Sequence, residues 1–235
     1  MNTHRKTAII VGVLFIIGTV SGVLSFGAFL GPFLDDPDYL TNAAANESQI
    51  IIGALLVLVM GFPLAMVPVM LFPIFRKHNE VLALGSVVFR GVLEAVNYIA
   101  IAVGWLLLIT FSREFVKAGA PDASYFQTLG TSLLETLHWL DHTLAIVFCL
   151  GALMIYYLFY QLKLIPRWLS LWGFIGALLY IAAPLLNLFD PLRPTLSVTS
   201  GVGILMAPLA VQEMVFALWM IVKGFNPSAI VSESA

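Results

Sequence analysis

The sequence predicts an all-α polytopic membrane protein, a bundle of six transmembrane helices with both termini in the cytoplasm. Hydrophobic residues make up 60% of the 235 positions and charged residues only 10%, whereas soluble domains carry about 25% charged residues. Mean hydropathy is +0.99. Six apolar segments reach the ~20 residues that cross ~30 Å of hydrocarbon. Basic residues also gather at alternate ends of these segments. Membrane lipids are therefore the first expected partners.

The six predicted segments form one transmembrane domain over residues 1–223, followed by a polar tail at 224–235. The third and fourth segments are long enough to tilt in the bilayer or to project beyond it. The predicted spans lie near 7–30, 49–75, 81–112, 128–160, 168–190 and 199–222.

The distribution of basic residues predicts the orientation. Cytoplasmic ends of membrane helices carry an excess of Lys and Arg. The opposite ends hold only Arg113, Lys117 and Arg193, so the richer set marks the cytoplasm, together with both termini. That set comprises Arg5, Lys6, Arg76, Lys77, Lys163, Arg167 and Lys223.

The first segment carries two pairs of glycines at four-residue spacing. Gly18 and Gly22 form one pair, and Gly27 and Gly31 form the other. Such pairs allow a second helix to approach the backbone closely. We expect this segment to pack tightly against a neighbour.

The second segment contains three prolines. Pro63, Pro68 and Pro73 each remove a backbone donor and crowd the preceding turn, so we expect kinks. Broken helices line the cavities of many carriers, but proline is also tolerated where neighbours satisfy the freed carbonyls. Both readings remain open.

The third and sixth segments carry ionisable groups. Arg90, Glu94 and Asn97 share one helical face at i, i+4 and i+7 spacing. Glu213 lies well inside the sixth segment. At ~1.5 Å per residue, both Arg90 and Glu213 are about 15 Å from the cytoplasmic ends of their helices.

The fourth segment adds four ionisable groups within one arc of a helix: Glu135, His138, Asp141 and His142. Counted from an outer end near residue 128, Glu135 and His138 also lie ~10–15 Å deep. Charged groups in a bilayer normally face the bundle interior. The sequence therefore predicts a polar midplane site between helices three, four and six.

Charge balance limits the state of that site. Arg90 offsets only one of the four carboxyl groups at positions 94, 135, 141 and 213. A dry site cannot keep the others ionised. Either some carboxyl groups hold protons, or the two histidines do, or a cation enters.

Three functions follow from these residues. The first is a proton- or cation-coupled carrier of a small molecule, with Arg90, Glu94, Asn97, Asp141 and Glu213 binding substrate or ions. No internal repeat supports it. The second is a metal-dependent hydrolase of a lipid or amide, with Glu135, His138 and His142 as catalytic residues and ligands of a divalent metal. The third is a structural or sensory protein with a buried polar network.

Other classes lack their signatures. The net charge of −2 gives no indication of nucleic acid, and one cysteine, Cys149, excludes an internal disulfide framework. No phosphate-binding loop, nucleophile elbow or C-x-x-C motif is present. Oligomeric state stays open.

Several blocks resemble one family. They are LALGSVVFR at 82–90, KLIPRWLSLWG at 163–173, QEMVFALWMIVKGFNP at 212–227, DYL at 38–40 and KAGAPD at 117–122. These blocks are similar to the bacterial multi-pass membrane family catalogued as domain of unknown function 4386. The resemblance implies a multi-pass protein of the bacterial cytoplasmic (inner) membrane. It supplies no active site.

Overall fold

Six helices long and apolar enough to cross a membrane make up the computed structural model, which describes residues 3–33, 36–118, 120–189 and 201–231. Within those ranges helices are joined by turns and no strand is present, so the predicted all-α fold class is confirmed. The spans are Thr3–Phe33, Glu47–Phe75, Glu80–Lys117, Ala123–Leu162, Arg167–Asn187 and Gly201–Val222. The cytoplasmic placement of the termini stays a prediction.

Three spans join α-helix to tighter or wider turns. The first combines α1 (Thr3–Leu24), the π-helix η1 (Ser25–Leu30) and the 3₁₀-helix η2 (Gly31–Phe33). The third combines α4 (Glu80–Ser86), the π-helix η3 (Val87–Leu93) and α5 (Glu94–Lys117). The sixth combines the 3₁₀-helix η4 (Gly201–Met206) with α8 (Ala207–Val222).

The other spans are single helices: α3 (Glu47–Phe75), α6 (Ala120–Leu162) and α7 (Arg167–Asn187). Two short helices were not expected from the sequence. These are α2 (Tyr39–Ala45), between the first two spans, and α9 (Pro227–Val231), after the last. Asn79 caps α4 by accepting a hydrogen bond from the Leu82 amide at 3.0 Å.

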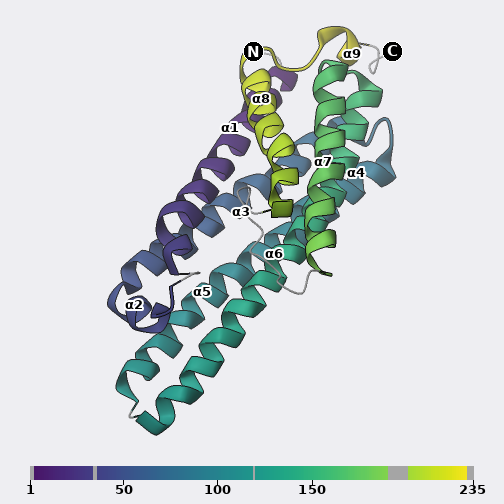
Figure 1. Cartoon of the computed structure of the whole chain (residues 1–235). Helices are drawn as coiled ribbons and strands as arrows, with labels where there is room; N and C mark the ends of the chain where they lie inside the picture. Colours follow the sequence, from purple (N-terminus) through teal and green to yellow (C-terminus); the bar gives the residue numbers. More distant parts are fainter. Residues whose placement is uncertain (1–2, 34–35, 119, 190–200, 232–235) are drawn as a thin grey trace.

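The spans form a closed ring in chain order. α1 packs on α3, α3 on α5, α5 on α6, α6 on α7, and α7 on α8, and α8 returns to α1 (Figure 1). The last contact includes Arg5, whose guanidinium donates to the carbonyls of Met220 (3.2 Å), Ile221 (2.6 Å) and Val222 (3.1 Å). These carbonyls lack partners within the helix, so Arg5 caps the end of α8.

One of the two glycine pairs closes the α1–α3 contact. A Cβ atom at Gly18 would lie 2.5 Å from Leu64 Cγ, and one at Gly22 would lie 2.4 Å from Met60 Sδ. The expected tight packing is confirmed there. Gly27 has no neighbour within 4 Å of such an atom, so the second pair does not serve the same purpose.

α3 continues through all three prolines. The helix runs from Glu47 to Phe75 with Pro63, Pro68 and Pro73 inside it. Pro68 lies near η3, where a Cβ atom at Gly91 would be 3.6 Å from the proline ring and 3.5 Å from the Ala65 carbonyl oxygen. The π-helix η3 thus packs against a proline-containing part of α3.

The α5–α6 hairpin is longer than the other helix pairs and extends past them, away from the termini (Figure 1). α6 has 43 residues, or ~64 Å at ~1.5 Å per residue, against ~30 Å of hydrocarbon. α2 packs on the hairpin, and the Tyr39 hydroxyl donates to the Gln127 carbonyl at 3.3 Å. We therefore infer that the far end of the hairpin lies outside the bilayer.

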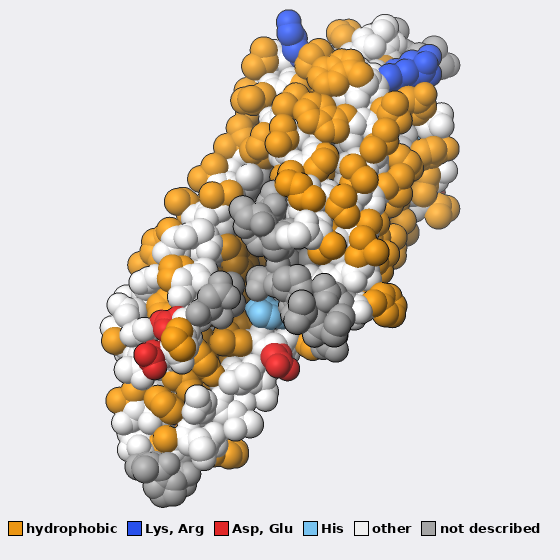
Figure 2. Space-filling view, viewed as in Figure 1, with side chains coloured by type: hydrophobic (Ala, Val, Ile, Leu, Met, Phe, Trp, Pro, Cys, Tyr) orange, Lys and Arg blue, Asp and Glu red, His pale blue; other side chains and the backbone are white. Residues whose placement is uncertain are grey.

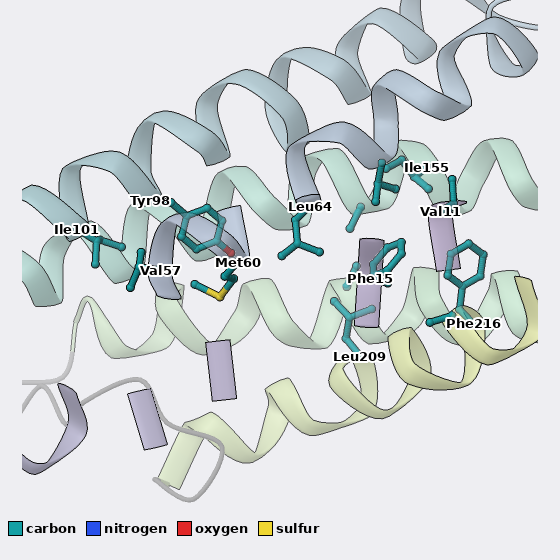
Figure 3. Packing of buried hydrophobic residues seen from close by; sticks show 14 of the residues in the cluster. Val11, Phe15, Val57, Met60, Leu64, Tyr98, Ile101, Ile155, Leu209 and Phe216 are labelled. Atoms are coloured by element: carbon teal, nitrogen blue, oxygen red, sulfur yellow. The ribbon is translucent and has the colours of Figure 1, made fainter. Parts of the chain in front are cut away.

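Basic and acidic side chains occupy different ends on the face shown in Figure 2. Lys and Arg appear at the end that carries both termini, whereas Asp and Glu appear on the lower half. Figure 3 shows buried core residues from several helices, among them Phe15, Tyr98 and Phe216. Phe216 packs against Phe15 at 5.3 Å and against Phe159 at 5.2 Å between ring centroids.

Candidate functional site

A buried ion cluster lies at the centre of the ring. The Arg90 side chain is 1% exposed, and its guanidinium contacts two carboxylates. Nη2 donates to Glu213 Oε1 at 2.8 Å, and Nη1 contacts Glu94 Oε2 at 3.5 Å. Glu94 is also 1% exposed, and Glu213 is 13% exposed. The third and sixth spans therefore bring Arg90 and Glu213 together, as predicted from their similar distances to the ends of their helices.

Neighbouring side chains enclose the cluster. The Arg90 guanidinium carbon lies 4.2 Å from the Phe148 ring centroid and 5.4 Å from that of Phe15, within the range of cation–π attraction. The Tyr98 hydroxyl donates to Glu94 Oε1 at 3.2 Å. Sequence reasoning missed Tyr98, although its i+4 spacing from Glu94 would have indicated it.

The backbone around Arg90 is irregular. Arg90 lies in the π-helix η3, which widens the helix by one residue per turn. Opposite it, α6 presents Gly151, where a Cβ atom would lie only 2.7 Å from the Arg90 amide nitrogen. A glycine is needed at this crossing. π-Helical turns are frequent at functional sites.

α8 supplies a second polar residue beside Glu213. The Gln212 amide nitrogen donates to the Leu169 carbonyl of α7 at 3.1 Å, and Gln212 is fully buried. From α6, the fully buried Tyr156 interacts electrostatically with Arg90 and Glu213. The polar centre therefore draws on the third, fourth and sixth spans, with α7 beside it.

The residues of the fourth span that lie at the level of Arg90 are not the ones predicted from the sequence. Gly151 lies opposite Arg90, Thr143 opposite Asn97 and Leu137 opposite Gly104. At ~1.5 Å per residue, Glu135 is then ~24 Å along α6 from the level of Arg90. The expectation that their levels match is wrong. The reason is that α6 begins at Ala120 rather than near residue 128, so its outer end projects.

The remaining predicted residues lie between these levels. Asn97 donates to the Leu93 carbonyl at 2.9 Å and accepts a hydrogen bond from the Thr143 hydroxyl at 3.0 Å. His142 is buried, and its Nδ1 lies 2.6 Å from the His138 carbonyl oxygen. Asp141 is partly buried, whereas Glu135 is exposed. They form no part of the Arg90 cluster's direct contacts.

Across the described ranges, no group of three or more His, Cys, Asp or Glu side chains is close enough to hold a metal ion. Glu135, His138 and His142 thus share a helix without forming such a group. Their catalytic or metal-binding roles stay predictions from the sequence.

These features define the class: a polytopic membrane protein whose six spans enclose one arginine and two glutamates. The chain belongs to the family described as "Domain of unknown function (DUF4386)", whose model matches residues 10–224. The resemblance seen in the sequence is confirmed. No curated protein and no solved structure matches the chain.

Proposed function

We propose that the chain is a proton-coupled membrane carrier of a small molecule, in which the Arg90 cluster binds and releases a proton. The observation that supports the proposal is the charge balance of the cluster. One guanidinium contacts two carboxylates, and all three side chains are largely removed from solvent. With both carboxylates ionised, the cluster carries an excess negative charge.

A buried charge without compensation is costly, and a carboxylate avoids the cost by taking up a proton. Arg90 stays positively charged because a guanidinium is not deprotonated in proteins. The cluster therefore has two accessible states, one with a shared proton and one without. Intramembrane carboxylates of this kind serve as proton relays in pumps and carriers.

Other titratable groups near the cluster set the surroundings of that proton. Tyr98 of α5 contacts Glu94 directly. Cys149 and Tyr156 of α6 and Tyr180 of α7 lie near the cluster. All are neutral in their ordinary forms, so the two carboxyl groups remain the sites of proton exchange.

The irregular backbone supports a conformational response. η3 carries Arg90 and packs against α3 near Pro68. Non-ideal backbone at membrane depth occurs where it is buried in protein or lines a cavity. A change of charge at Glu94 or Glu213 would act, through Arg90, on a helical segment that already departs from regular α-helix.

Proton binding can be tested with purified protein in detergent. Difference infrared spectroscopy during a pH titration should show the carbonyl stretch of a protonated carboxyl group. Glu94→Gln or Glu213→Gln should remove or shift that band. Glu114→Gln is the matched control, because Glu114 pairs with Lys117 on the exposed surface. A titration that neither cluster variant changes would contradict the proposal.

Transport requires a second measurement. Liposomes containing the protein and a pH-sensitive dye are held under an imposed potassium diffusion potential while a panel of small metabolites is added one at a time. At least one should speed acidification beyond that of protein-free liposomes, and Glu213→Gln should abolish the increase. A structural network is the other candidate, favoured by the enclosure of Arg90 between Phe15 and Phe148. It predicts no titrating band and no added flux.

A further inference from the structure

A second polar feature lies at the end of the molecule that holds the termini, away from the Arg90 cluster. It is a cavity of about 510 Å³ between the α6–α7 turn and the segment that follows α8. Its charged lining residues are Lys163, Arg167 and Lys223, and none of the described residues that line it is acidic. From these features we propose that the cavity binds the headgroup of an anionic phospholipid.

The two loops that form the cavity are tied together. The Asn226 amide donates to the Leu164 carbonyl at 2.7 Å, and the Asn226 side chain donates to the Lys163 carbonyl at 3.4 Å. Leu164 and Phe225 are buried beneath them. The two loops that carry the basic side chains are therefore held together by hydrogen bonds.

Lys163 occupies a backbone conformation that favours glycine. Its φ angle is +53°, and it is the only described non-glycine residue with a positive φ. Glycine would adopt this angle without strain, as Gly224 does on the other side of the cavity with φ +74°. The chain thus keeps a cation at a position where a lysine costs backbone energy.

The surroundings place the cavity at headgroup depth. Trp168 packs against Trp172 and Trp219, each pair 6.3 Å apart between ring centroids. Tryptophan is enriched where hydrocarbon meets the headgroups. Trp219 also lines the cavity. Exposed Leu171 and Leu218 on α7 and α8 offer apolar surface to acyl chains.

The charge pattern selects a phosphate group. Pro166 and Arg167 line the cavity at the start of α7, so the positive end of this 21-residue helix adds to the three cations. The Arg167 guanidinium is positioned over the Tyr160 ring, 5.2 Å from its centroid. A zwitterionic headgroup would leave its own cation against these groups, so an anionic lipid is favoured.

The test is native mass spectrometry of the full chain with phosphatidylglycerol and with phosphatidylcholine. Phosphatidylglycerol should bind more tightly, and Lys163→Gln/Arg167→Gln/Lys223→Gln should weaken it on the order of tenfold or more. The matched control is Lys6→Gln/Arg76→Gln/Lys77→Gln, which removes the same charge from exposed residues at the same end. An equal loss in both triple variants would overturn the proposal.

A variant of Lys163 and a competition with inorganic phosphate test the proposal further. Lys163→Gly should raise the unfolding temperature, because strain is relieved, and still lower phosphatidylglycerol affinity; a gain in both would overturn the role of Lys163. Inorganic phosphate at millimolar concentration should not displace the lipid. Full displacement would assign the cavity to a free anion and overturn the lipid proposal, as would equal affinity for phosphatidylcholine.

Discussion

Gly151 of α6 lies against the backbone of Arg90, so that a Cβ atom on Gly151 would be 2.6 Å from Arg90 Cβ and 2.7 Å from its amide nitrogen. Backbone atoms cannot move aside as the end of a flexible side chain can. The guanidinium of Arg90 is held from its other end by Glu94 and Glu213. The position of Arg90 is therefore fixed both by a helix crossing and by its ion pairs.

Gly151→Ala should destabilise the protein by about 1–3 kcal/mol, the usual cost of overpacking a tight interior. Thermal unfolding in detergent measures the change. Gly27→Ala is the control, because no atom lies within 4 Å of the added methyl group. Equal unfolding temperatures for the two variants would show that α6 does not approach Arg90 this closely.

Arg90→Met should destabilise the protein by about 3–5 kcal/mol, because removing one partner of a buried ion pair leaves the other charges uncompensated. Adding Glu94→Gln and Glu213→Gln to this variant should recover part of the loss, since no buried charge then remains. Chemical denaturation measures both. If Arg90→Met alone unfolds like the wild type, the carboxyl groups are not held by Arg90.

Glu135→Cys should react with a membrane-impermeant maleimide on the side of the membrane opposite the termini. At ~1.5 Å per residue, position 135 is ~40 Å from the α6–α7 turn, beyond ~30 Å of hydrocarbon. Cys149 is the only native cysteine and is fully buried, so the wild type is the control. Protection of the introduced cysteine in intact membranes would show that the hairpin does not project.

The fold was largely predictable because the bilayer restricts it. Every backbone polar group in hydrocarbon must be satisfied within the protein, so a long apolar segment becomes a helix. The irregular turns were not predictable in this way. η3 lies against Gly151 of α6 at Arg90 and against Pro68 of α3 at Gly91, and these contacts join three separate segments of the chain.

The candidate site was predicted in part. Arg90 and Glu213 were correctly brought together because charged turns mark the ends from which their depths were counted. The depth of the residues in helix four was counted from its outer end, and no charged turn shows where that end lies. Counted instead from Lys163, the level of Arg90 falls near Gly151, as the structure shows. Tyr98 could have been found from its i+4 spacing to Glu94, whereas the basic cavity at Lys163 brings together segments far apart in the sequence and needed the three-dimensional arrangement.

The contact between Arg5 and the end of α8 has a consequence for how the protein is made. α1 is synthesised before the other five spans and α8 after them, yet the Arg5 guanidinium binds the carbonyls of Met220, Ile221 and Val222. The contact between α1 and α8 can therefore form only after α8 has been synthesised. A chain truncated before residue 220 would lack the carbonyl acceptors that Arg5 binds.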